Sequence, residues 1–251
     1  MDFSENIASA AALIRAKGAR GMAFTGAGIS VESGIPPFRG PGGLWHKYDP
    51  EFIELNYFYA HPERSWAQIR EVFYDNWGGA VPNGAHKAVA QLEQEGCLHT
   101  VVTQNIDCLH QRAGSKHVLE FHGTLDKLLC TECGRRFGTT RKLIEPERPS
   151  CPECGRLLKP DFVFFSEGIP DDAFEGSFAA ASGCDYVIVI GTTGEVMPAC
   201  EVPREAKRHG AKIIEVNLQE SAYTNSVTDI FLRGRAVEVM ETLLRKVQAC
   251  D

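Results

Sequence analysis

The sequence lacks any apolar run long enough to cross a bilayer, because its wholly apolar stretches, such as residues 187–190 and 162–165, have the length of a β-strand. It also lacks an excess of positive charge: 26 basic and 33 acidic residues give a net charge of −7. Dedicated duplex-DNA binders carry a basic footprint, so nucleic acid is not expected as a direct specific partner. The apolar run at residues 7–14 follows acids rather than bases, so neither a signal peptide nor a membrane partner is expected.

The nine cysteines are an odd number, so they cannot all form disulfides, and a cytoplasmic protein with reduced thiols is expected. Four of them form two C-x-x-C pairs, Cys130 with Cys133 and Cys151 with Cys154, separated by seventeen residues. This spacing is typical of two knuckles that complete a tetrahedral zinc site, and a redox dithiol pair is the alternative. Because four thiolates leave no open coordination position, the zinc is expected to be structural.

Short apolar segments alternate with helical patterns along most of the 251 residues. Helices are expected at residues 4–17, 85–94, 201–209 and 236–248, and strands at 21–25, 100–103, 118–120, 162–165, 186–190 and 212–216. Continuous apolar strands between helices indicate a parallel sheet covered on both faces. The predicted fold class is therefore α/β, with a doubly wound, Rossmann-like domain.

Two regions do not follow this alternation. Residues 36–80 are rich in proline, glycine and aromatic residues, and residues 126–159 hold the C-x-x-C pairs. We expect a helical insertion and a zinc ribbon that together form a small lobe, while residues 1–35, 81–125 and 160–251 form the Rossmann-like domain. A ligand cleft is expected between the lobes, at the carboxyl ends of the strands.

Gly26-Ala27-Gly28 follows the first strand, as in turns that bring the backbone close to a pyrophosphate. The third glycine of G-x-G-x-x-G is absent, because Val31 occupies that position, and no strand ending in an acid follows about 20 residues on. A hydride-transfer enzyme is therefore poorly supported. Arg39, which follows two prolines and Phe38, could pair with phosphate through its guanidinium.

Several short motifs occur in the order found in one family. They are Gly26-Ala27-Gly28-Ile29-Ser30, Phe38-Arg39-Gly40, Thr103-Gln104-Asn105-Ile106-Asp107, Glu120-Phe121-His122-Gly123, the two cysteine pairs, residues 159–167 and Gly191-Thr192-Thr193. The sequence resembles the sirtuins over roughly residues 20–220. This resemblance implies an NAD-dependent protein-lysine deacylase that consumes NAD as a co-substrate. Its products would be free lysine, nicotinamide and an O-acyl-ADP-ribose.

The resemblance also implies roles for individual residues. His122 matches the general base, a role that suits an imidazole with a pKa near neutrality, and Asn105 matches the residue that orients the ribose and a water. Asp107 would hydrogen-bond the nicotinamide carboxamide. The implied cofactor-binding set is Gly26, Ala27, Gly28, Ile29, Ser30, Val31, Phe38, Arg39, Gln104, Asn105, Ile106, Asp107, His122, Gly191, Thr192, Thr193 and Asn217.

Acyl-lysine proteins or peptides are the implied partners of a monomeric enzyme. The peptide would add as an extended strand between residues 163–166 and the loop at residues 191–196. The implied substrate-binding residues are Val163, Phe164, Phe165, Ser166, Glu195 and Val196. The chain departs from the family pattern at Pro37, Cys108, Ser166 and residues 193–195, which leaves the rate and the acyl preference open.

Uncharged acyl groups, chiefly acetyl, are expected to be preferred. Sirtuins that accept acidic acyl groups pair the carboxylate with a Tyr-x-x-Arg motif, which residues 57–70 lack although Arg64 and Arg70 are present. The acyl channel is expected to be lined by aromatic and aliphatic residues, drawn from Trp45, Phe52, Phe58, Trp66 and Ile69.

Two other functions stay open. The same pocket could serve mono-ADP-ribosyl transfer or NAD hydrolysis, and only product analysis separates these reactions from deacylation. A non-catalytic zinc-ribbon module is the other alternative, since bases surround the cysteine pairs. These bases are Arg135, Arg136, Arg141, Lys142 and Arg148. The acidity of the chain disfavours a binding role for them.

Overall fold

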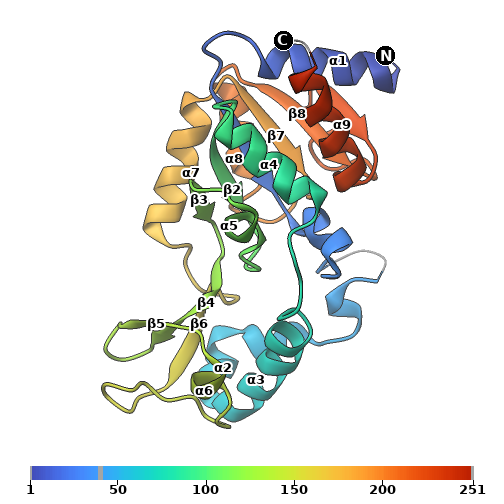
Figure 1. Cartoon of the computed structure of the whole chain (residues 1–251). Coiled ribbons are helices and arrows are strands. Elements are labelled where there is room, and N and C mark those ends of the chain that lie inside the picture. The colour runs from blue at the N-terminus through green and yellow to red at the C-terminus, as the bar shows by residue number, and fades with distance from the viewer. Residues whose placement is uncertain (1, 39–41, 250–251) are drawn as a thin grey trace.

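The computed structural model describes residues 2–38 and 42–249, so the prediction for Arg39 lies outside the described residues. Figure 1 shows two lobes, with both ends of the chain on the larger one. The larger lobe is built on six parallel strands: β1 (Gly21–Thr25), β2 (Leu98–Thr103), β3 (Val118–Glu120), β7 (Tyr186–Ile190), β8 (Lys212–Asn217) and β9 (Ile230–Arg233). Their order, β3-β2-β1-β7-β8-β9, is that of a doubly wound dinucleotide-binding fold, as predicted.

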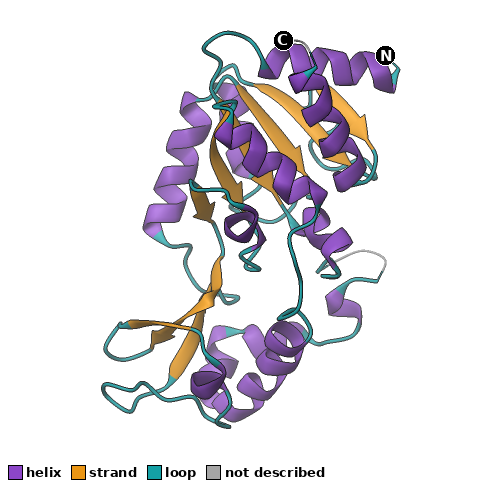
Figure 2. Ribbon diagram, viewed as in Figure 1, coloured by secondary structure: helices purple, strands orange, loops and turns teal. Residues whose placement is uncertain are grey.

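Helices cover both faces of this sheet (Figure 2). One face packs against α1 (Phe3–Ile14), α4 (Gly84–Gln94) and α9 (Ala236–Gln248), and the other against α7 (Asp171–Gly183) and α8 (Glu201–Arg208). Within β1, Ala23 joins the first of these cores, whereas Met22 and Phe24 join the second. This alternation follows from the two-residue period of a strand, and burial on both faces explains why the strands are continuously apolar.

The smaller lobe combines segments that are far apart in the sequence. Its antiparallel strands are β4 (Gly123–Cys130), β5 (Arg136–Gly138) and β6 (Leu158–Phe162). Its helical part contains η2 (Leu44–His46), η3 (Pro50–Ile53), α2 (Leu55–Ala60), α3 (Pro62–Ile69), the π-helical η4 (Arg70–Asp75) and α6 (Arg141–Ile144). These parts share one apolar core, in which Trp66, Phe73 and Leu128 are buried. The helical region and the cysteine region therefore pack together.

One predicted strand is wrong. Residues 162–165 were expected in the parallel sheet, but β6 ends at Phe162 and pairs antiparallel with β4 in the smaller lobe. The next residues turn away because their backbones bond elsewhere: Val163 N–H donates to His122 O (2.8 Å), and Phe165 N–H donates to Ile53 O (2.9 Å). In the described part of the chain, no helix is both long and apolar enough to cross a membrane.

Candidate functional site

The site begins where β1 and β7 end side by side. Gly26 N–H donates to Ile190 O (3.0 Å), and Gly28 N–H donates to Gly191 O (2.8 Å). A Cβ atom on Gly28 would lie 2.5 Å from Gly191 Cα, and Gly191 itself has a φ of +63°. Only glycine tolerates this close approach and this conformation. Both glycines therefore belong to the structure that joins the two loops, where the strand order of the sheet reverses.

The turn after β1 leads into η1 (Ala27–Ser33). The N–H groups of Gly26, Gly28 and Ile29 already have partners within the turn or on the neighbouring strand. The side chain of Ile29 is fully buried in the core, whereas Val31 is exposed. Ala27 N–H is left without a backbone acceptor in the described residues, as expected for the first residue of a helix.

Polar side chains from the segment after β2 connect to this turn. Asn105 Nδ2 donates to Gly26 O and to Ser30 Oγ, both at 3.1 Å, and Ser30 Oγ donates to Asp107 Oδ2 at 2.7 Å. Burial raises the pKa of Asp107, while the Ser30 hydroxyl acts in the opposite direction. The side chain of Ile106 instead points into the core of the smaller lobe. Three of the predicted residues, Ser30, Asn105 and Asp107, thus form one hydrogen-bonded group.

Gln104 and Asn217 link this group to the loop after β7. Gln104 Nε2 donates to Thr192 Oγ1 (3.0 Å), and Asn217 Nδ2 donates to Thr192 O (2.8 Å). Thr193 is exposed beside them. The ends of β1, β2, β7 and β8 therefore meet at one edge of the sheet, as predicted from the positions of these residues in the sequence.

A cleft of about 190 Å³ lies at this edge. Four predicted cofactor-binding residues, Gly28, Val31, Gly191 and Asn217, contribute to its lining. Residues 234–236, where the family resemblance implies a backbone contact to the adenine, also line it. Glu32, Val216 and Leu218 complete the lining and were not predicted, and Glu32 Oε2 accepts a hydrogen bond from Val237 N–H at the start of α9 (2.9 Å).

His122 lies half-buried just after β3. Its Nδ1 atom is 3.0 Å from Gln104 O, so Nδ1 carries the proton and Nε2 carries the lone pair. Burial lowers the pKa of His122, and the Gln104 carbonyl acts in the opposite direction. The ring is therefore neutral near pH 7 and can accept a proton at Nε2.

Two further histidines lie beneath the site. The sequence predicted no role for either, although His110 lies in the family-like motif of residues 109–114. His86 Nε2 lies 3.4 Å from Ser30 Oγ, and His110 Nε2 lies 2.9 Å from Thr25 Oγ1. Their rings are 5.0 Å apart, edge to face. Burial lowers the pKa of His86 to about 4, and burial together with the nearby His86 lowers the pKa of His110 to about 3. Both rings are therefore neutral parts of the support under the site.

The segment at 163–166 begins beside His122 through the bond from Val163 N–H to His122 O. Phe165 is exposed, whereas Phe164 is 1% exposed and packs in the core of the smaller lobe. Glu195 is exposed and Val196 is half-buried. In the described residues no hydrogen bond joins segment 163–166 to residues 195–196, so an extended chain could lie between them.

The predicted lining of the acyl channel is largely wrong. Phe58, Trp66 and Ile69 have no exposed surface and form the core of the smaller lobe, and Phe52 is also buried. Aromatic side chains bury a large apolar area each, which suits the core of a small lobe. Trp45 is only partly buried, and its ring centroid lies 5.3 Å from that of Phe38 and 6.2 Å from that of Phe165. These three rings are the aromatic group next to segment 163–166.

Two departures from the motif pattern occupy unusual backbone conformations. Cys108 has a φ of +61° and Ser166 a φ of +67°, and they are the non-glycine residues with positive φ in the described chain. This left-handed region favours glycine because a side chain there contacts the backbone. The Cys108 thiol is buried 3.0 Å from Thr124 Oγ1, and burial raises its pKa to about 12.

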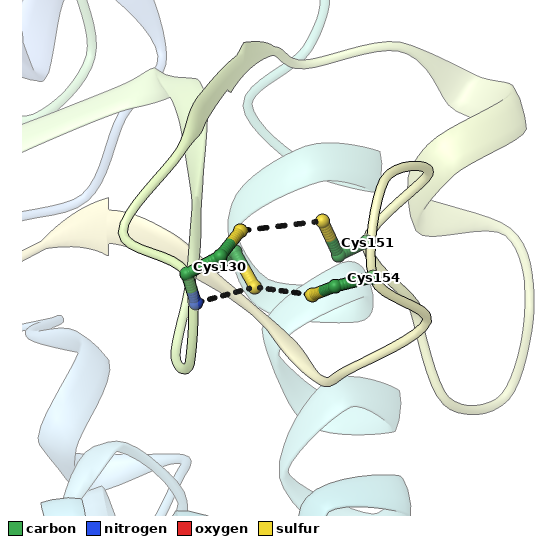
Figure 3. A group of neighbouring side chains, drawn as sticks. Cys130, Cys151 and Cys154 are labelled. Atoms are coloured by element: carbon green, nitrogen blue, oxygen red, sulfur yellow. Dashed lines mark hydrogen bonds between the residues drawn. The ribbon is translucent and has the colours of Figure 1, made fainter.

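The four paired cysteines come together in the smaller lobe, and Figure 3 shows Cys130, Cys151 and Cys154 of this cluster. Their sulfur atoms all lie within 4.8 Å of one another, with 3.5 Å between Cys130 and Cys154 and 3.9 Å between Cys133 and Cys151. A tetrahedron of 2.3 Å Zn–S bonds requires sulfur atoms about 3.8 Å apart. The cluster therefore fits a zinc ion bound by four thiolates.

The arginines around this cluster face acids. Arg135 pairs with Glu153 at 2.6 Å, and Arg136 pairs with Asp161 at 2.7 Å. Two longer-range pairs, Arg141 with Asp75 and Arg148 with Glu63, connect the cysteine region to the helical region. Each of these four arginines therefore has an acidic partner.

Comparisons with known proteins agree on one family. The Sir2 family profile matches residues 26–198. The chain is 40% identical over 250 residues to "NAD-dependent protein deacetylase 1" of Pyrobaculum aerophilum, covering 99% of this chain and 98% of that protein. It is 44% identical over 252 residues to an "NAD-dependent protein deacylase" of Thermococcus kodakarensis, with 95% of each covered.

Solved structures give the same result. A Sir2 homologue in complex with NAD superposes with a TM-score of 0.88 at 39% identity, covering 99% of this chain and 94% of that chain. A Sir2 protein with a deacetylated p53 peptide and 3′-O-acetyl ADP-ribose superposes with a TM-score of 0.87 at 34% identity, covering 98% of each chain.

Proposed function

This chain belongs to the Sir2 family and is an NAD-dependent protein deacylase, and on that premise we propose how its own residues perform the reaction. The observation that carries the proposal is the position of His122. Its Nδ1 atom is engaged by Gln104, while Asn105, two positions from the Thr103 that ends β2, bonds to the glycine turn. The base and the predicted cofactor-binding edge are thus joined through residues 104 and 105.

The residues at the sheet edge fit NAD. Ala27 N–H is available for the diphosphate, and the cleft beside Asn217 has room for part of the adenosine. Asp107 and Asn105 would hold the nicotinamide ribose end, while Phe38 would shield it from water beside Trp45. When bound, NAD supplies an electrophilic ribose carbon, and its nicotinamide is the leaving group.

His122 would remove a proton from a ribose hydroxyl through Nε2. Its lowered pKa keeps this nitrogen unprotonated near neutral pH. Asn105, with its amide nitrogen already donating to Gly26 O and Ser30 Oγ, has its side-chain oxygen left to orient a hydroxyl or a water. His122 would thus accept the proton, and Asn105 would hold the hydroxyl or water in place.

An acyl-lysine peptide, chiefly acetyl-lysine, would bind as an added strand between segment 163–166 and residues 195–196. Phe165 and Trp45 would flank the acyl group. A monomeric, cytoplasmic enzyme without a nucleic-acid partner remains our prediction. The eight described cysteines, all free of disulfides, fit a reducing compartment.

One zinc ion held by Cys130, Cys133, Cys151 and Cys154 would be structural, because four thiolates complete its coordination. We retain the division into a Rossmann-like domain of residues 1–35, 81–125 and 160–251 and a small domain of residues 36–80 and 126–159, with one change at the boundaries. Residues 123–125 and 160–164 go with the small domain, because β4 and β6 pair in its sheet and Phe164 packs in its core.

The test is incubation with NAD and an acetyl-lysine peptide, followed by mass spectrometry. Deacylation predicts deacetylated peptide, nicotinamide and O-acetyl-ADP-ribose in equal amounts. ADP-ribosylated protein, or nicotinamide and ADP-ribose with the peptide still acetylated, would instead assign the pocket to transfer or hydrolysis.

A further inference from the structure

A buried ion pair lies directly beneath segment 163–166. The Lys159 side chain, on β6, is only 3% exposed, and its Nζ atom lies 2.9 Å from Glu167 Oε2. Nζ also donates to Phe162 O at 2.7 Å and to Pro160 O at 3.1 Å. All three donors of the ammonium group are therefore satisfied. Burial lowers the pKa of Lys159, and Glu167 acts in the opposite direction.

Glu167 closes the other end of the same loop. The Oε2 atom that accepts from Lys159 also accepts from Phe164 N–H at 2.8 Å, and Glu167 N–H donates to Phe164 O at 3.1 Å. The ion pair thus connects the end of β6 to residues 164 and 167. Ser166, with its left-handed backbone, lies inside the closed loop.

The loop has two more attachments, one to the proposed base and one to the helical part of the smaller lobe. Val163 N–H bonds to His122 O, and the backbone of Phe165 bonds to Ile53 O and to Leu55 N–H. The Lys159 ammonium also lies 4.1 Å from the centroid of the buried Phe164 ring. The alternating side chains of residues 162–165 are therefore held with Phe164 inward and Phe165 outward.

These attachments leave particular backbone groups unused. In the described chain, Val163 C=O and Ser166 N–H have no hydrogen-bond partner. They are the kind of groups that an added strand pairs with, since main-chain hydrogen bonds supply the affinity in that binding mode. The distance between Val163 C=O and Ser166 N–H, and the directions in which they point, depend on the closed loop, because no regular sheet holds residues 163–166.

We propose that the Lys159–Glu167 ion pair fixes the backbone of segment 163–166 in the conformation that binds the acyl-lysine peptide, which makes Lys159 a positioning residue for that substrate. This role rests on the proposed function, because it requires segment 163–166 to be the peptide-binding edge. Lys159 touches neither the glycine turn nor the cleft at Asn217, so NAD binding does not depend on it.

The test compares KM for an acetyl-lysine peptide with Kd for NAD in four variants. Lys159→Met keeps the length of the side chain but removes the ammonium group. Glu167→Ala removes the acceptor for Lys159 and Phe164, and Glu167→Gln keeps a neutral acceptor. Lys207→Met is the matched control. Lys207, on α8, also forms an ion pair, with Asp229 at 2.6 Å, but it touches no residue of the loop.

Lys159→Met and Glu167→Ala are expected to raise the peptide KM by about tenfold or more, since a displacement of about 1 Å in a positioned group has effects of this size. The Kd for NAD should be unchanged, Glu167→Gln should retain most of the peptide affinity, and Lys207→Met should match wild type. If Lys159→Met does not fold, Glu167→Ala decides, because Glu167 is 27% exposed and can be truncated with less disturbance.

An unchanged peptide KM in a folded variant would overturn the proposal. So would a parallel weakening of peptide and NAD binding, because that pattern indicates general loosening of the fold. Wild-type protein that leaves the acetyl group on the peptide would contradict the proposed function itself, which separates the two failures.

Discussion

Gln104 O lies 3.0 Å from His122 Nδ1, and the same residue's Nε2 donates to Thr192 Oγ1 at 3.0 Å. The backbone carbonyl and the side-chain amide of Gln104 therefore connect the proposed base to the loop after β7. The bond at Nδ1 sets the tautomer of His122, which leaves Nε2 as the proton acceptor. The orientation of the base and the geometry of the cofactor edge are thus coupled through a single residue.

The pH dependence of kcat/KM should report His122. A general base acts when unprotonated, so activity should rise with pH and level off above the pKa of His122. Burial holds this pKa below its ordinary value of 6.5, so the plateau should already be reached near neutral pH. Initial rates between pH 5 and 8 at low peptide concentration measure the profile. An inflection well above neutral pH would contradict the assignment.

Loss of zinc should unfold the smaller lobe. Removal of zinc by a chelator, or Cys130→Ala, should remove the link between the two knuckles and with it most activity. A loss of about 3 kcal/mol would lower Tm by about 10 °C in a chain of this size. Cys184→Ala is the control, because Cys184 lies outside the cluster. A metal-free sample with unchanged Tm and full activity would show that the zinc is dispensable.

Stability should fall in mild acid because of His110. Its pKa is about 3 in the folded protein and about 6.5 when unfolded, so the unfolded state binds more protons below pH 6.5. At pH 5 this difference removes about 2 kcal/mol of stability relative to neutral pH.

His110→Gln should remove that contribution and flatten the decline. His117→Gln serves as the control, because the His117 side chain is 74% exposed. Urea unfolding at pH 7.5 and pH 5 gives the free energies. Equal acid sensitivity in His110→Gln and wild type would show that His110 does not titrate in this way.

Acetyl-lysine should be a far better substrate than succinyl-lysine. Phe38, Trp45 and Phe165 surround the expected acyl position, and Arg70 is already bonded to Ile144 O and Pro146 O. An unpaired buried carboxylate costs several kcal/mol, so kcat/KM for the succinyl peptide should be lower than for the acetyl peptide by about 100-fold or more. Comparable values on one peptide would indicate a charge partner for the carboxylate.

The sequence predicted the cysteine cluster and the parallel sheet, except for β9, because both have local signatures. Continuous apolar strands and fixed C-x-x-C spacing depend on neighbouring residues alone. The strand expected at residues 162–165 was wrong for the opposite reason. A short apolar run can form a strand of a sheet or a loop. Here hydrogen bonds to His122 and Ile53, which are distant in the sequence, hold these residues in a loop.

The aromatic residues and the histidines show a second limit. Phe58 and Trp66 were expected in the channel but lie in the core, because composition does not indicate which ring faces outward. His86 and His110 are isolated histidines in helical segments, and their pairing depends on how α4 packs against α5 (Leu109–Ala113). No spacing rule relates them, so their pairing could not be predicted from the sequence.

The most direct test of the account is His122→Ala, assayed for O-acetyl-ADP-ribose with NAD and an acetyl-lysine peptide. We expect kcat to fall by about 10²–10⁴-fold, as for loss of a positioned general base, with NAD binding and Tm retained. The control His117→Ala, at an exposed position, should match wild type. Turnover by His122→Ala at the wild-type rate would contradict the account.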